Sequence, residues 1–155
     1  MKKVFILLIS AVLLFGICAC SKTMPDNVDY TVLEARHIDY GEHSIEEDYW
    51  TSTVFTLNTN GKLTREDNFN ISESEKIEVS ISKNDVKKII DILEKQKYSK
   101  DDNDATDGSI WKIKYFDKNG KIISDYDGYI YNKKGYKELS NLLNNFTNDN
   151  IDIKK

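Results

Sequence analysis

Two Asn-Gly dipeptides, Asn60-Gly61 and Asn119-Gly120, each lie between runs of alternating apolar and polar residues, and this arrangement limits the fold more than any other feature. Asn-Gly is a strong short signal for a β-hairpin, because both central residues of a type I′ turn need positive φ. The strands before and after each turn should therefore pair antiparallel. The sequence thus predicts two hairpins in different halves of one chain.

The residues around these turns predict a set of short strands. Alternating runs rich in β-branched and aromatic side chains are typical of strands with one buried face. On this basis we expect strands at residues 30–38, 50–57, 63 onward, 76–81, 111–115, 121–126 and 129–131. Asp127-Gly128 should separate the last two of these strands.

Two further segments have helical periodicity. The first should follow Ser82 as the N-cap and cover residues 83–97, and the second should follow Asn132 and cover residues 133–146. Their apolar faces consist of Val86, Ile89, Ile90 and Leu93 in the first helix, and of Tyr136, Leu139, Leu142, Leu143 and Phe146 in the second. This order of elements predicts an α+β fold, with an antiparallel sheet and two amphipathic helices packed on one face.

Both Asn-Gly turns continue with lysine and lead through a strand to a helix, which raises internal duplication as one explanation. The distance from turn to helix is longer in the first half of the chain. Common turn chemistry is therefore the preferred explanation, and duplication stays as the alternative.

The N-terminal segment has the composition of an export signal. Lys2 and Lys3 precede an apolar run from Val4 to Phe15 that only Ser10 interrupts. This run is shorter than the roughly 20 apolar residues that a membrane-spanning helix needs, so it predicts a secretory signal peptide. It should be no part of the folded domain.

The residues after this run carry a family resemblance. Ile17-Cys18-Ala19-Cys20 resembles the lipobox of bacterial lipoproteins, in which a small residue precedes the cysteine that receives the lipid. The resemblance implies a diacylglycerol on Cys20, cleavage just before it and loss of Cys18 with the signal peptide. An ordinary signal peptide with an incidental cysteine is the alternative. The expected organisation is a signal peptide at 1–19, a lipidated cysteine and tether at 20–29, and a single α+β domain at 30–150.

A second resemblance concerns residues 111–131, WKIKYFDKNGKIISDYDGYIY. An aromatic strand, an Asn-Gly turn and a Gly-Tyr-Ile-Tyr strand before a final helix are similar to the pattern in small lipoproteins of Gram-positive bacteria. This resemblance implies an architecture and brings no activity with it.

Charge and cysteine content exclude several classes of function. The chain has 22 basic and 26 acidic residues, and loss of Lys2 and Lys3 with the signal peptide leaves a net charge of −6. Such a domain offers no excess of cations to replace phosphate counterions, so nucleic acid is not an expected partner. It should not lie flat on anionic lipid either, so we expect the lipid on Cys20 to hold it at the membrane. No cysteine follows Cys20, which excludes thiol catalysis, thiolate-bound zinc and disulfides in the domain.

The best candidates for chemistry surround the two histidines. His37 and Asp39 should share one face of a strand. Glu42 and His43 follow closely enough to bend back as further metal ligands. No HExxH helix or G-x-S-x-G turn accompanies them, so we expect solvated side chains and assign no metal site and no catalytic residue. The acid pair Glu46-Glu47 is likewise expected at the solvated surface.

Residues 100–108 are a further acidic candidate. Asp102, Asp104 and Asp107 are followed by a glycine, but their spacing is one residue out of register for an EF-hand and the closing glutamate is missing. We expect a solvated connection there and no calcium site.

Tyrosine is enriched in the C-terminal strands, at Tyr115, Tyr126, Tyr129 and Tyr131. Exposed tyrosines could stack on sugars or line an interface, but tyrosine is also a good strand residue. We expect these side chains to fill the core or the sheet edge more than to form a binding platform.

The sequence therefore predicts a lipoprotein held at the cell membrane through Cys20 and facing outside the cytoplasm. Missing motifs favour a non-catalytic binding module without a cofactor, with another envelope protein or a wall component as the partner. The alternative is an envelope enzyme or metal-dependent protein with a site around His37, Asp39 and His43.

Overall fold

The computed structural model describes residues 29–97 and 109–148. They form an α+β fold with an antiparallel sheet and two helices, as the sequence predicts. The elements in chain order are β1 (Thr31–Asp39), β2 (Trp50–Asn58), β3 (Lys62–Phe69), β4 (Glu75–Ser80), α2 (Lys83–Gln96), β5 (Ser109–Phe116), β6 (Ile122–Gly128) and α3 (Lys134–Asn148).

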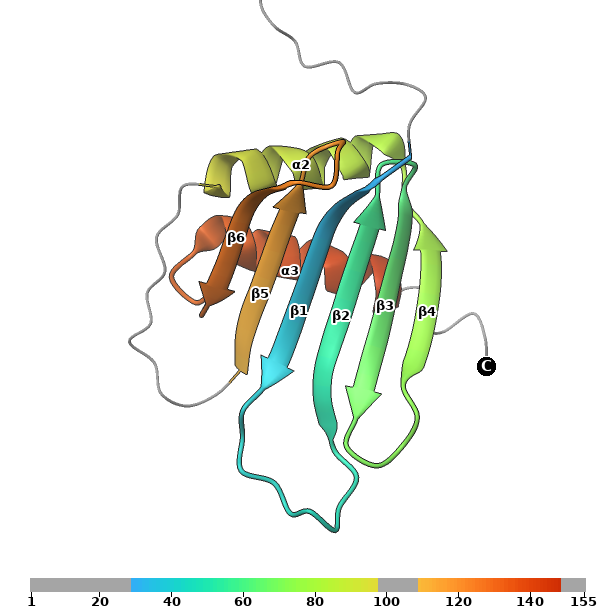
Figure 1. The fold of residues 1–155 in the computed structure, drawn as a ribbon, viewed down its shortest axis with the longest axis vertical. Coiled ribbons are helices and arrows are strands. Elements are labelled where there is room, and N and C mark those ends of the chain that lie inside the picture. Colours follow the sequence, from blue (N-terminus) through green and yellow to red (C-terminus); the bar gives the residue numbers. More distant parts are fainter. Residues whose placement is uncertain (1–28, 98–108, 149–155) are drawn as a thin grey trace, which may run out of the picture.

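The six strands form one sheet in the order β4-β3-β2-β1-β5-β6, with every neighbouring pair antiparallel (Figure 1). The first four strands form a meander, and the β5–β6 hairpin pairs with the free side of β1. The first strand is therefore in the interior of the sheet. Its two neighbours come from different halves of the chain, so the two predicted hairpins are parts of one sheet.

The strand register defines two ends of the sheet. Three pairs of facing residues fix the first end: Thr31 with Asn58, Leu33 with Tyr115, and Lys62 with Ser80. The start of β1, the β2–β3 turn, the β4–α2 junction and the β5–β6 turn therefore lie together, at the top of Figure 1, and we call this the tether end. The opposite end carries the β1–β2 loop, residues 40–49, and the β3–β4 loop, residues 70–74, and we call it the loop end.

Both Asn-Gly turns are formed, but the predicted type I′ geometry is wrong. Gly61 has φ 93° and Gly120 has φ 75°, whereas no residue other than glycine has positive φ in the described ranges. The N–H of Gly61 bonds to the carbonyl of Asn58, and that of Gly120 to the carbonyl of Asp117, each at 3.0 Å. This pattern fits a type I turn followed by a left-handed glycine, so only the glycine of each dipeptide takes the unusual conformation.

The predicted short strand at 129–131 is also wrong. β6 continues through Gly128, and the residues after it belong to no strand. The N–H of Lys133 bonds to the carbonyl of Ile130 at 3.1 Å, so the chain is already turning toward α3. The alternation of tyrosine and isoleucine there reflects this connection and not a sheet strand.

The helices contribute a large part of the core. Ser82 caps α2 as expected, since its hydroxyl accepts the N–H of Asp85 at 3.2 Å. One residue of the expected apolar face of α2 is wrong. Ile90 is only half-buried, and Ile92, which was not in the expected set, is buried instead. The buried residues of the helices are Val86, Ile89, Ile92 and Leu93 in α2, and Tyr136, Leu139, Leu143 and Thr147 in α3. Leu142 and Phe146, also expected on the buried side, are partly buried against the core.

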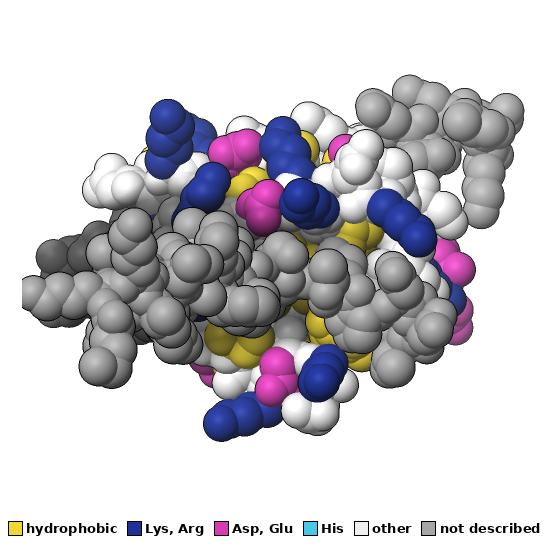
Figure 2. All heavy atoms as spheres, turned by 90° about the horizontal axis from the view of Figure 1, so that it is seen from above, with side chains coloured by type: hydrophobic (Ala, Val, Ile, Leu, Met, Phe, Trp, Pro, Cys, Tyr) yellow, Lys and Arg dark blue, Asp and Glu magenta, His cyan; other side chains and the backbone are white. Residues whose placement is uncertain are grey.

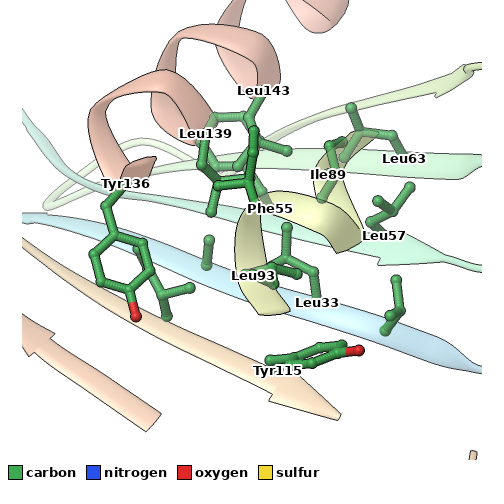
Figure 3. Packing of buried hydrophobic residues seen from close by; sticks show 14 of the residues in the cluster. Leu33, Phe55, Leu57, Leu63, Ile89, Leu93, Tyr115, Tyr136, Leu139 and Leu143 are labelled. Atoms are coloured by element: carbon green, nitrogen blue, oxygen red, sulfur yellow. The ribbon is translucent and has the colours of Figure 1, made fainter. Parts of the chain in front are cut away.

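Figure 3 shows how these side chains meet the sheet: Leu139 and Leu143 of α3 and Ile89 and Leu93 of α2 lie among Leu33, Phe55, Leu57, Leu63 and Tyr115. In the view of Figure 1 both helices lie behind the strands, with α2 nearer the tether end. The strands β1 to β3 extend below both helices toward the loop end. Neither helix is long and apolar enough to cross a membrane, as far as the described residues go.

Candidate functional site at the loop end

Three rings from three strands meet at the loop end, and we call them the tryptophan stack although only His37 and Trp111 are parallel. His37 of β1 faces Trp111 of β5 across the ladder, and the two ring centroids lie 4.7 Å apart at an interplanar angle of 11°. The Trp50 ring, at the start of β2, lies 4.9 Å from His37 and is tilted by 50°. Both tryptophans of the chain therefore contact the same imidazole. Thr53 is the other cross-strand partner of His37, so it lies on the same side of the sheet.

A chain of polar contacts leads from this stack to α3. The indole N–H of Trp50 donates to Oγ1 of Thr53 at 2.9 Å, and this hydroxyl donates to the Asp67 carboxylate. Nε of Arg65 lies 2.9 Å from Oδ2 of Asp67, and a terminal nitrogen of Arg65 donates to Oδ1 of Asn148 at 2.5 Å. Asp67 is buried, and a buried charge is tolerated when it is paired and hydrogen-bonded. These contacts join the loop end to the last residue of α3.

The imidazole of His37 retains spare hydrogen-bonding capacity. Within residues 29–97 and 109–148, neither of its ring nitrogens forms a hydrogen bond. The ring is only partly buried, so this leaves no buried polar atom without a partner in that part of the chain. Burial lowers the pKa of His37 below its ordinary value, and the nearby Asp39 carboxylate opposes this effect only in part. The neutral ring presents one donor and one acceptor, so it can form a hydrogen bond with a group that approaches from solvent.

The predicted set of His37, Asp39 and His43 is brought together only in part. Nε2 of His43 lies 2.7 Å from Oδ2 of Asp39, and the His43 ring stacks on Tyr49 with centroids 4.1 Å apart. The N–H of Gly41 bonds to the Asp39 carboxylate at 2.9 Å, and this bond, followed by that of His43, lowers the pKa of Asp39. His37 belongs to the tryptophan stack instead. Across the described part of the chain, no three His, Cys, Asp or Glu side chains are grouped so as to hold a metal ion.

The two loops of this end are tied to each other. Asn70 accepts the N–H of Tyr49 at 2.9 Å and donates through its amide to the carbonyl of Glu47 at 3.1 Å. The Asp48 carboxylate accepts the N–H of Ile71 at 3.3 Å. Each loop thus supplies partners for the backbone of the other, and the pair forms one hydrogen-bonded surface.

Large apolar side chains are exposed on these two loops and in the connection from β6 to α3. Tyr40 is 59% exposed, Ile45 89%, Ile71 61% and Tyr131 84%. The first three belong to the two loops, and Tyr131 lies in the connection from β6 to α3. Exposed acidic residues lie in or beside the same loops: Glu42, Glu46, Glu47, Asp48, Glu73 and Glu75. Exposed apolar side chains surrounded by charged ones are a common feature of protein-interaction surfaces.

The tyrosines of the second half divide between core and surface. Tyr115 and Tyr126 are buried, in agreement with the expected packing role, whereas Tyr131 is exposed. The Tyr115 hydroxyl donates to Oε1 of Glu94 in α2 at 2.7 Å, and burial together with this carboxylate raises the pKa of Tyr115. Glu46 and Glu47 are exposed, as the sequence predicts for an acid pair.

Two predicted features lie outside the described residues. They are the lipidation site at Cys20 and the acidic segment 100–108 with Asp102, Asp104 and Asp107. Both predictions rest on the sequence alone.

Sequence reasoning did not find the Arg65–Asp67 pair or the tryptophan stack. A usable signal for the pair exists, because Leu63, Arg65 and Asp67 alternate in one strand and so share a face. With Leu63 in the core, the two charged residues had to point to the same side. The stack has no such local signal, since Trp50 and Trp111 meet His37 only through the order of the strands.

Comparison with known proteins gives no match of any kind. No family model matches the chain, and no curated protein or solved structure matches it. The function proposed below therefore rests on the residues and geometry of this chain.

Proposed function

We propose that this chain is an extracytoplasmic lipoprotein, anchored in the cell membrane by a lipid on Cys20, whose loop end binds another envelope protein. In this proposal the protein has no catalytic role and no cofactor. The observation that carries it is the set of exposed apolar side chains on two hydrogen-bonded loops, at the end of the sheet away from the tether.

The position of the chain's entry into the domain supports the orientation. Asp29 precedes β1 at the tether end and is held there by the side-chain amide of Asn60 at 2.8 Å. A lipidated Cys20 would therefore connect to the domain from the side opposite to Ile45 and Ile71. The loop end would face away from the bilayer, where it is free to meet a partner.

Pre-organisation of the two loops supports binding. Loops that must become ordered on binding lose conformational freedom, and this loss reduces affinity. Asn70 and Asp48 already hold the two loops together, so less freedom remains to be lost. We include in the proposal that both amphipathic helices pack on one face of the sheet, where they provide a stable base for the loops.

The polar groups of the site favour binding over catalysis. The Thr53 hydroxyl accepts from Trp50 and donates to Asp67, whose carboxylate is also held by Arg65. A nucleophile or a general base needs a reactive atom in reach of a substrate. The neutral ring of His37 keeps free nitrogen atoms that a general base would also need, but the Thr53 hydroxyl beside it is already engaged, so the proposal assigns these nitrogens to recognition of a partner group.

A protein partner is favoured over a wall glycan by the character of the surface. Isoleucine side chains at 45 and 71 offer aliphatic contact, which suits an apolar patch on a protein. The acidic rim suits basic side chains around that patch. A wall component is the other outcome of the test.

The test places a photo-reactive amino acid at Glu46 in the loop end and, in a second variant, at Asn119 in the tether end. We expect a defined protein cross-link from position 46 in intact cells and none from position 119. In the Glu46 variant, an additional Ile71→Asp substitution should abolish the cross-link, whereas the matched change Ile122→Asp, at a residue that is 44% exposed near the tether end, should leave it intact.

Two results would contradict the proposal. The first is equal cross-linking from both ends of the sheet. The second is a cross-link from position 46 that survives Ile71→Asp while the variant keeps the wild-type melting temperature. If position 46 cross-links to wall material instead of protein, the loop end is still the binding site, but the partner is a wall component.

A further inference from the structure

The chain contains two Asn-Gly dipeptides, at residues 60–61 and 119–120, and each is followed by lysine. Asparagine loses its side-chain amide most readily before glycine, because glycine has no side chain to hinder its own backbone nitrogen. Both turns lie at the tether end, and Figure 2 views the molecule from this end and shows acidic and basic side chains interspersed there. The two sites thus share a local sequence and one end of the molecule, so their own contacts are what distinguishes them.

Loss of the amide proceeds through a ring in the main chain. The backbone nitrogen of the glycine attacks the side-chain carbonyl carbon, Cγ, of the preceding asparagine and loses its proton, and the amide nitrogen leaves as ammonia. The product is a five-membered succinimide, which water opens at either of its two carbonyl groups to give aspartate or isoaspartate. The asparagine side chain must rotate toward the following nitrogen for this attack, so contacts that fix its amide slow the reaction.

The Asn60 amide is held on both of its polar atoms. Its nitrogen donates to the Asp29 carboxylate at 2.8 Å, and its oxygen accepts the backbone N–H of Lys62 at 2.8 Å. The glycine that follows is buried, and its carbonyl oxygen accepts the N–H of Ile81 at 2.9 Å. Rotation of the Asn60 side chain therefore breaks two hydrogen bonds, one of them to a charged group, and opening of the turn also breaks the bond to Ile81.

The Asn119 amide differs from that of Asn60. Within residues 29–97 and 109–148, neither polar atom of the Asn119 amide forms a hydrogen bond. Asn119 and Gly120 are both exposed, and a Cβ atom on Gly120 would meet no atom within 4 Å. The side chain can therefore rotate without the loss of a hydrogen bond, and the turn has open space in which to move.

One backbone contact opposes the reaction in both turns. The N–H of each glycine bonds to a carbonyl oxygen of the preceding chain at 3.0 Å, so either turn must open before this nitrogen can react. The other bonds of the second turn join Asp117 to Asn119 and Lys121, at 2.8 to 2.9 Å. A local opening of the turn releases them together, whereas the first turn is also tied to the chain before β1 and after β4. The second turn should therefore open more often.

We propose that Asn119 is a site of spontaneous deamidation in the folded protein and that Asn60 is protected from it. Water is the only other reactant, and the inference does not depend on the proposed anchor or partner. Each converted chain gains a carboxylate between Lys118 and Lys121, and the isoaspartate product also carries an extra methylene group in its main chain. The spacing at which Asp117 accepts two N–H groups is then lost, so isoaspartate should weaken the β5–β6 turn more than aspartate does.

The experiment uses the protein as isolated from cells, incubated at mildly alkaline pH, where the glycine nitrogen loses its proton more easily. Samples are digested at mildly acidic pH to prevent conversion during digestion. Peptide mass spectrometry then follows asparagine, aspartate and isoaspartate at both positions. A parallel sample in concentrated urea gives the rates for the unfolded chain, and these should be similar because both sites read Asn-Gly-Lys.

In the folded protein we expect conversion at position 119 to be at least about tenfold faster than at position 60, which corresponds to about 1.4 kcal/mol of activation free energy. Asp29→Ala should raise the rate at position 60 and leave that at position 119 unchanged, since it releases only the Asn60 amide. The matched change Asp91→Ala removes the same charge from an exposed helix position and should alter neither rate. Wild type rich in isoaspartate should melt at a lower temperature than Asn119→Asp, which has the same charge and a normal main chain.

Equal rates at the two positions of the folded protein would overturn the inference. So would a folded protein in which neither position converts while both convert in urea, because the second turn would then protect its asparagine as well as the first. A rate at position 60 that does not respond to Asp29→Ala, in a variant that keeps a cooperative melting transition, would overturn the assigned cause of protection. None of these results bears on the anchor or on the loop-end binding site.

Discussion

The two ends of the sheet are closed by different means. At the tether end, short turns reverse the chain within a few residues, and each uses one left-handed glycine. At the loop end, two longer loops bond to each other, and the stack of His37 with Trp50 and Trp111 brings together strands from both halves of the sequence. The turns of the tether end are therefore closed mainly by neighbours in sequence, with added contacts from Asp29 and Ile81, whereas the loop end is closed by residues far apart in sequence.

This difference separates the roles that we propose for the ends. Short turns leave little chain exposed at the end where the proposed tether enters the domain. The loop end depends on the strand order, so it forms only when the whole sheet forms. A recognition surface built in this way is present in the native state and absent from partly folded chains.

The largest predicted effect concerns the lipid anchor that would hold the tether end at the membrane. Cys20→Ala should move the protein from the membrane to the soluble fraction, because it removes the lipid that anchors the chain in this proposal. Cys18→Ala should stay in the membrane fraction, since that residue precedes the cleavage site. Fractionation with the reverse dependence would show that Cys18 is the anchor.

The next prediction compares an ion pair at each end. Arg65 and Asp67 at the loop end have side chains 18% and 12% exposed, whereas Lys62 and Glu78 at the tether end are 47% and 52% exposed. Asp67→Ala should reduce the free energy of unfolding by about 2–4 kcal/mol, because it leaves the guanidinium and the Thr53 hydroxyl without this carboxylate. Glu78→Ala should cost less than about 1 kcal/mol, since solvent screens an exposed pair. Urea denaturation of both variants measures the contrast, and similar midpoints would remove the distinction between the ends.

A smaller contrast lies within the tether end itself. A Cβ atom on Gly61 would lie 2.4 Å from the carbonyl oxygen of Ile81, whereas a Cβ on Gly120 would meet no atom within 4 Å. Gly120→Ala should therefore cost about 1 kcal/mol for the left-handed conformation alone. Gly61→Ala should cost at least about 2 kcal/mol, because the backbone at the β4–α2 junction must also move. Thermal unfolding that ranks the two variants in the opposite order would show that the junction yields easily.

The contrast between local contacts and contacts across the sheet also explains how much of the fold could be predicted from the sequence. Ser82 as the N-cap and the antiparallel hairpins follow from local chemistry and periodicity, and the structure contains them. Both helices lie within two residues of their expected ranges, but α3 begins at Lys134 and not directly after Asn132. The turn type was wrong because Asn-Gly fits two hairpin geometries: a two-residue type I′ turn with positive φ at both residues, and a longer type I turn in which the asparagine keeps negative φ and only the following glycine is left-handed.

The pairing of β5 with β1 was beyond local reasoning. Nothing near Trp111 in the sequence indicates that His37 will lie opposite, and so neither the stack nor the separation of His37 from His43 could be foreseen. The exposed isoleucines at 45 and 71 look like ordinary loop residues until the loops are seen to meet. Residues that share a strand or a helix were predictable, and residues that meet across the sheet were not.

The smallest effect concerns the response of the loop end to pH. Burial lowers the pKa of His37 below the ordinary 6.5, so the folded protein takes up this proton less readily than the unfolded chain. Unfolding is then linked to proton uptake, and stability falls as the pH drops through about 6.5 and stops falling below the folded pKa of His37. Asp39, two residues along β1, responds in a separate window, since its pKa lies below the ordinary 3.8 and its contribution is lost only in stronger acid.

His37→Phe isolates this response, because phenylalanine keeps a ring between the two indoles and does not titrate. Wild type should lose melting temperature between pH 7.5 and pH 5.5, and the variant should lose less over the same interval. The carboxylates are common to both chains, so the difference between the two curves reports the imidazole. Identical curves would mean that His37 is as easily protonated in the folded chain as in the unfolded one, and the stack would then be open enough to admit water around the whole ring.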